Sequence, residues 1–256
     1  MKSKLSTHAW CLFPVFMLVL SSFLTAKSVN ESSFATIKLI FKNIVKNRKI
    51  VLNDSTYTNP FGESYTISKL RYYITNVTLH GKSRSAVEKE SYHLVDASNT
   101  ETQVVTFSVP AATYDGISFL LGVDSLHNVS GAQTGDLDPA KDMFWTWNSG
   151  YVMAKMEGNS PASTLVNHKF EFHIGGFSGS NSVLKDITLD FPKPDLNWAA
   201  GKTYDIIINA DINSWWQNPH DVKIAEHANV TSPGQSARDI SDNYASMFHI
   251  EKIIAE

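Results

Sequence analysis

The chain has 256 residues, of which 43% are hydrophobic and 18% are charged, enough for one large or two small domains with a full core. Its formal net charge of −3 excludes the basic field that attracts nucleic acid or an anionic membrane surface.

The N-terminus has the pattern of a secretory signal. Lys2 and Lys4 precede an apolar run over residues 9–24, and the small residue Ala26 follows. This order predicts a signal peptide over residues 1–26, cleaved after Ala26. A transmembrane anchor is the alternative, but the apolar run is short for a span. We therefore expect an exported protein of the periplasm or cell surface, with no transmembrane segment in the mature chain.

The single cysteine, Cys11, lies inside this signal. The mature chain would then have no cysteine, so it must rely on its core rather than on disulfides. It would also lack a thiolate metal site and a cysteine nucleophile.

Alternation of apolar and polar residues predicts strands in the first half of the chain. Ile37, Leu39 and Phe41 share one face of a strand over residues 34–41. The aromatic and β-branched run at 70–79 predicts another strand, and the Asn-, Thr- and Pro-rich stretch at 51–65 predicts a loop. Three more strands are expected, at 92–95, 103–109 and 114–124.

The second half begins with a polar stretch at 126–142, which predicts a long loop leading into an aromatic strand around Trp145. Further strands are expected at 169–174, 185–191 and 203–212. Ser232 and Pro233 predict the start of a short amphipathic helix. Its apolar positions are Ile240, Tyr244, Met247 and Phe248.

Eight to ten strands with almost no helix predict an all-β fold, either a β-sandwich or a barrel. There is no linker of biased composition and no internal repeat. We expect a single β-sandwich-like domain over residues 30–256, with a short C-terminal helix.

An aromatic hairpin is the most conspicuous candidate site. Trp145 and Trp147 are two residues apart, so on a strand they share a face, and His173 follows on a later strand. A core-packing role for the tryptophans and a solvent-facing role for a lone histidine are the simpler interpretations of each residue alone.

Other candidates are weaker. His220 and His227 flank Asp221 and Glu226, and imidazoles without thiolates suit copper or zinc. An exposed polar loop is the simpler interpretation of that segment. Asp124 ends a strand just before the 126–142 loop, where it would serve either as a ligand or as a cap of the turn.

Signatures of common enzymes are missing. The sequence has no G-x-S-x-G, no H-E-x-x-H and no glycine-rich phosphate loop. Without a recognisable nucleophile and base, we expect a binding protein rather than an enzyme.

Several segments together resemble the MbnP-like copper-binding proteins, a family named for a protein encoded with the copper-chelating peptide methanobactin. The W-x-W-x-x-G-Y and H-I-G-G motifs are the most specific of them. The resemblance covers nearly the whole mature chain, through residues 70–76, 122–125, 128–131, 137–139, 143–151, 170–176, 232–234 and 243–248.

The resemblance implies an exported β-rich protein that binds copper. In related copper proteins a tryptophan is oxidised to kynurenine and joins histidines around copper(I), with a di-haem MauG-like peroxidase as the oxidising partner. It implies His173 as a ligand, Trp145 or Trp147 as the oxidised residue and His220 as a second ligand. The related W-x-H pair is replaced here by Trp145-Thr146-Trp147.

Two hypotheses follow. In the first, His173 binds copper with a second imidazole from His220 or His227, and Trp145, Trp147 and Asp124 border the site. In the second, the protein is a metal-free exported binding or adhesion module that uses the aromatic hairpin and the 126–142 loop.

Overall fold

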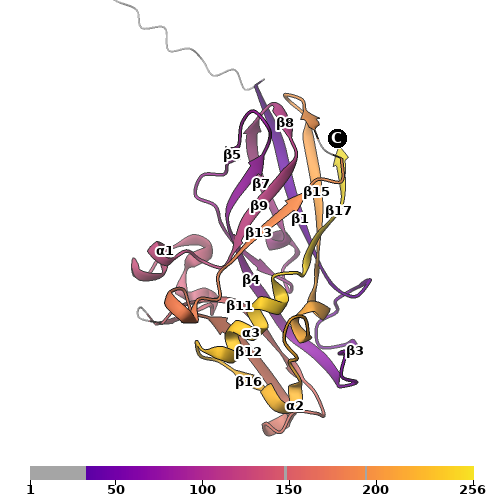
Figure 1. Ribbon diagram of the computed structural model, residues 1–256, viewed down its shortest axis with the longest axis vertical. Helices are drawn as coiled ribbons and strands as arrows, with labels where there is room; N and C mark the ends of the chain where they lie inside the picture. The colour runs from indigo at the N-terminus through magenta and orange to yellow at the C-terminus, as the bar shows by residue number, and fades with distance from the viewer. Residues whose placement is uncertain (1–32, 147–148, 194) are drawn as a thin grey trace, which may run out of the picture. The chain divides into compact units, whose positions relative to one another are not determined.

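The larger sheet is built around β4 (Ser64–His80), a strand of 17 residues. The computed structural model describes residues 33–146, 149–193 and 195–256, which belong to one compact unit (Figure 1). β4 pairs with β11 through its first half and with β9 through its second half, so it joins the two halves of the sheet. The expected signal peptide, residues 1–26, lies outside the described residues.

Ten of the described strands make up this sheet. Its main path is β13 (Lys185–Asp190), β9 (Gly116–Leu121), β4, β11 (Gly150–Asn159), β12 (Lys169–Gly175) and β16 (Asn229–Val230). Short strands extend it: β3 (Thr56–Thr58), β5 (Ala86–Val87) and β6 (Tyr92–Asp96) pair with β4, and β10 (Phe144–Thr146) pairs with β11.

A second sheet has five described strands, β17 (Phe248–Ala255), β15 (Thr203–Asp211), β1 (Phe34–Val45), β2 (Arg48–Lys49) and β7 (Val104–Pro110). β1 and β15 run parallel, and the other pairs are antiparallel. β8 (Ala112–Tyr114) and β14 (Leu196–Trp198) form a separate pair. The predicted all-β, sandwich-like class is confirmed.

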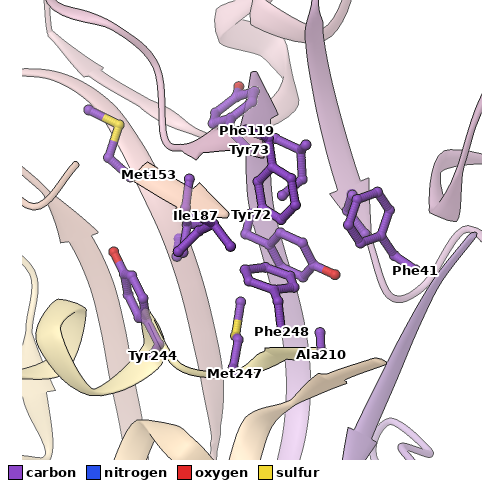
Figure 2. Packing of buried hydrophobic residues seen from close by; sticks show 14 of the residues in the cluster. Phe41, Tyr72, Tyr73, Phe119, Met153, Ile187, Ala210, Tyr244, Met247 and Phe248 are labelled. Atoms are coloured by element: carbon purple, nitrogen blue, oxygen red, sulfur yellow. The ribbon is translucent and has the colours of Figure 1, made fainter. Parts of the chain in front are cut away.

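The main core fills the space between the two sheets. Phe41 of β1 reaches across to Tyr72 of β4, with ring centroids 6.3 Å apart, and to Phe119 of β9, 6.1 Å away (Figure 2). Phe248 of β17 closes the group at 5.1 Å from Phe119, and all three contacts are edge-on. The predicted inward set of Ile37, Leu39 and Phe41 is buried as expected.

The opposite face of the larger sheet is also covered. Tyr72 and Tyr73 are neighbours on β4 and so point to opposite faces, yet neither is exposed. Tyr73 packs edge-on against Tyr151, and the two hydroxyls donate to the carbonyls of Asp136 and Leu137.

The segment predicted as a polar loop at 126–142 provides this cover. It contains α1 (Ser125–Val129) and two 3-10 turns, η3 (Gly135–Leu137) and η4 (Pro139–Lys141). Leu137 of this segment and Met143, directly after it, are buried. The segment is therefore packed on the sheet.

The C-terminal helix α3 (Gln235–Tyr244) begins two residues after the predicted Pro233 and buries Ile240 and Tyr244 as expected. The predicted inclusion of Met247 and Phe248 is wrong, because Phe248 opens β17 opposite Ala210. The remaining helical turns are α2 (Ile224–His227), η2 (Thr100–Gln103), η5 (Val166–His168), η6 (Gly179–Asn181) and η7 (Ile212–Trp216).

Candidate metal centre

His173 lies on β12, on the face opposite the buried Phe172 and Ile174. Its Nε2 is 2.8 Å from Oε1 of Glu157 on the neighbouring strand β11, and its side chain is 20% exposed. Histidines that bind metals commonly donate one ring N–H to a carboxylate, which fixes the ring and leaves the other nitrogen for the metal. His173 has this arrangement, with Nδ1 as the remaining nitrogen.

A network of charges surrounds the His173–Glu157 pair. Lys155, opposite His173 on β11, is almost fully buried and donates to the Asp142 carbonyl and carboxylate. Lys69 lies 3.1 Å from Asp142 and 3.4 Å from Glu157. Partial burial would raise the pKa of Asp142, but hydrogen bonds from Lys155 and Lys69 outweigh it and hold that pKa below its usual value. Lys155 and Lys69 are therefore both paired with carboxylates.

The His173 hydrogen bond and the Lys69 charge lower the pKa of Glu157, against the opposing effect of burial. A carboxylate with a lower pKa in the folded chain adds stability above its unfolded pKa, about 4.3, and loses it as the pH falls through the folded value. We therefore expect Glu157→Gln to destabilise the protein at neutral pH, and the difference from wild type to shrink toward about pH 3.

Urea unfolding at several pH values measures this difference. Glu171→Gln is the control, because Glu171 lies two residues before His173 on β12 and forms no salt bridge within the described part of the chain. A Glu157→Gln difference that stayed constant with pH would contradict the assignment.

Trp145 of β10 packs against the face of β12 that carries His173. A Cβ placed on Gly175 would come within 2.5 Å of the Trp145 ring, so the indole packs directly on the Gly175 backbone. Gly175 and His173 are two residues apart and share a face, which separates them by about 7 Å along the strand. Glycine is required at 175 because any side chain would displace the indole. Trp147 lies outside the described residues.

The other two predicted ligands lie near α3. His220 donates its backbone N–H to Asn243, and its Nε2 is 3.3 Å from Asp242 and 3.7 Å from Asp239. His227 lines a small cavity together with Asp239. His220 and His227 therefore both lie near the Asp239 carboxylate. No contact among the described residues connects either histidine to His173.

The strand β9 ends at Leu121, before Asp124. Asp124 is the N-cap of α1, and capping was the second of its two predicted roles. One of its oxygens accepts the His127 backbone N–H. Its carboxylate also contacts the His127 ring, with Nδ1 3.0 Å from Oδ2, and the Tyr92 hydroxyl at 2.6 Å. Neither His127 nor Tyr92 was expected to have a functional role. The Asp-x-x-His spacing across one helical turn was the only signal for the histidine.

Asn128 connects α1 to the aromatic hairpin. This unexposed side chain donates to the carbonyls of Val123 and Asp124, and its oxygen accepts the Tyr151 backbone N–H. A Cβ on Gly150 would lie 2.2 Å from that oxygen. The segments at 122–131, 143–151 and 170–176 therefore meet in one region of the fold.

Within the described part of the chain, no group of three or more His, Cys, Asp or Glu side chains has a geometry that could hold a metal ion. This face of β12 instead carries one oriented imidazole, His173, two residues from Gly175, on which the indole of Trp145 from β10 packs. Few ligands and an apolar wall suit copper(I), which accepts low coordination numbers. No described helix has the length and apolar character needed to cross a membrane.

Comparison with known proteins identifies the family of this chain. Residues 34–233 match the MbnP family. The fold is similar to that of the solved structure titled "MbnP from Methylosinus trichosporium", with a TM-score of 0.51 and 12% sequence identity, over 87% of this chain and 99% of that one. No curated protein matches. Since the matched segment covers most of the 256 residues, the chain belongs to the MbnP family.

Proposed function

We propose that this protein is an exported copper-binding protein that holds copper(I) at His173 and does not itself catalyse a reaction. The observation that carries the proposal is the position of His173 on β12: Glu157 orients its ring, and Trp145 packs on the same face two residues away. Membership of the MbnP family supports the choice of copper.

Each residue has a distinct role in this proposal. His173 supplies the imidazole through Nδ1, while Glu157 holds Nε2 and fixes the ring. Trp145 covers the adjacent Gly175 backbone and excludes water from that side. Trp145 or Trp147 is the residue proposed to be oxidised to kynurenine by a di-haem MauG-like peroxidase. His220 or His227 is the proposed second imidazole.

Copper(I) titration of the purified mature protein tests the assignment. We expect about one copper(I) per wild-type chain and no stoichiometric binding by His173→Ala. Glu157→Gln should weaken binding about 10- to 100-fold, because the imidazole loses its orienting carboxylate. His249→Ala is the matched control: His249 is also a strand histidine, but it bonds to an amide, Asn209.

Unchanged copper binding by His173→Ala would overturn the site. Peptide mass mapping of protein from its own host tests the tryptophan separately. An oxidised peptide spanning Trp145 and Trp147 would support the kynurenine proposal, and intact tryptophans with bound copper would leave a plain histidine site.

One observation favours the second candidate, a metal-free binding module. Leu126 and Val129 of α1, one helical turn apart, are 70% and 61% exposed on a segment that otherwise packs on the sheet. Absence of copper after loading, with the fold intact, would favour this function.

A further inference from the structure

We propose that Tyr92, Asp124 and His127 form a second metal site, which takes a divalent cation of the Zn²⁺ or Cu²⁺ class. None of these three residues has a role in the proposed function above, so the second site does not rest on it. Asp124, expected from the sequence to border the copper site or to cap a turn, contacts both Tyr92 and His127 in the structure.

The three donor atoms form a small triangle. Tyr92 Oη is 2.6 Å from Asp124 Oδ2 and 2.7 Å from His127 Nδ1, and Nδ1 is 3.0 Å from Oδ2. Ligand atoms about 2.1 Å from a zinc or copper ion, at angles of about 90° to 110°, are about 3.0 to 3.4 Å apart. The triangle therefore reaches ligand spacing if its edges open by a few tenths of an ångström to somewhat less than one ångström.

Each side chain is held in place without a metal. The His127 backbone N–H fixes the Asp124 carboxylate through the cap of α1. The Tyr92 and His127 rings pack with centroids 4.3 Å apart. β6 and α1 are themselves anchored, since β6 pairs with β4 and Asn128 ties α1 to β11. Binding would thus require little ordering of the ligands.

The partners of Asp124 distinguish it from two other carboxylates of the chain, Asp142 and Asp242. Asp142 and Asp242 are paired with lysines, which do not bind metals at neutral pH. Among the described residues, the side chains that contact the Asp124 carboxylate are a phenol and an imidazole, two groups that become metal ligands by giving up a proton. At most two protons are available for hydrogen bonds between the three donor atoms, one on the phenol and one on Nδ1. A cation would replace them.

Charge and access both favour a cation. Glu90 adds a second negative charge near Tyr92. No lysine or arginine forms an ion pair with Asp124 in the part of the chain described by the structure. The His127 and Asp124 side chains are 29% and 25% exposed, so an ion can enter from solvent and complete its coordination with water. Imidazole, carboxylate and phenolate donors suit zinc and copper(II) rather than copper(I).

Titration of the full mature protein with Zn²⁺ alone, by calorimetry, is the first test. We expect binding that weakens about 100-fold in His127→Ala and in Tyr92→Phe. His93→Ala is the matched control, because His93 is adjacent to Tyr92 on β6 and also pairs with a carboxylate, Glu88. It should bind Zn²⁺ like wild type. Wild-type Zn²⁺ affinity in His127→Ala would overturn the proposal.

Cu²⁺ provides a readout that a structural hydrogen bond would not give. A phenolate bound to Cu²⁺ produces a visible charge-transfer band, which we expect in wild type and His173→Ala but not in Tyr92→Phe. Tyr92→Phe keeps the ring that packs on His127, so its fold should be preserved. Absence of the band from wild type would exclude Tyr92 as a ligand. Neither result affects the copper(I) assignment at His173.

Discussion

Replacing Trp216 by alanine is expected to lower the free energy of unfolding by about 3 to 5 kcal/mol, the usual cost of removing a large buried aromatic side chain. Trp216 ends η7 and is completely buried. Its ring lies 4.8 Å from that of Tyr65 and 5.8 Å from that of Phe172, and its indole N–H donates to the Tyr65 hydroxyl. Alanine would leave a cavity beneath β4 and β12 and an unpaired buried hydroxyl.

Urea unfolding of Trp216→Ala, Trp216→Phe and Trp145→Ala separates these contributions. Trp216→Phe keeps most of the ring packing and loses the hydrogen bond, which should cost about 1 to 3 kcal/mol. Trp145 is only partly buried, so Trp145→Ala should cost less than Trp216→Ala. Equal losses in the two alanine variants would show that burial at η7 does not determine stability.

Strands with strict alternation could be predicted because one face of each is buried. Phe170, Phe172 and Ile174 point into the core, as do Ile117, Phe119 and Leu121, and the period of two is visible in the sequence. The parallel pairing of β1 with β15 could not be predicted, since nothing local to either strand specifies a partner about 170 residues away.

β17 was missed because its alternation is interrupted. The register with β15 shifts where Ile207 pairs with Lys252 and Ile208 with Ile250, so one residue of β17 is left over as a bulge. Met247 and Phe248 also fall at helical spacing after Tyr244. Phe248 nevertheless lies on a strand, where its ring packs against Phe119 and Phe41 in the core.

The candidate metal centre was only partly predictable. Alternation placed His173 correctly on the face opposite Phe172, but its partner Glu157 is specified by the β11–β12 register. Tyr92 and His127 are 35 residues apart and meet only because the 126–142 segment folds back onto the sheet. The polar composition predicts a long loop there, but the segment packs on the sheet, with Leu137 within it and Met143 directly after it both buried.

Gly158→Ala is expected to destabilise the protein by about 3 kcal/mol or more, at the upper end of the range for overpacked sites. Gly158 lies on β11 between β4 and β12. A Cβ there would lie 1.9 Å from the Thr66 carbonyl oxygen and 2.7 Å from the Phe170 ring. The carbonyl is part of the β4 backbone, so it cannot move away without disturbing the pairing of the central strand.

Gly62→Ala separates this steric effect from backbone strain. Gly62 has a φ of +81° and nothing within 4 Å of its Cβ position, so alanine there pays only for the left-handed conformation, about 1 kcal/mol. Gly158 has no such conformation, so its cost must come from the contacts with the Thr66 carbonyl of β4 and the Phe170 ring of β12. If thermal and urea unfolding gave Gly158→Ala a loss no larger than that of Gly62→Ala, the close approach of β4 and β11 would be incorrect. A larger loss would identify Gly158 as the position that allows the two central strands to pack at this distance.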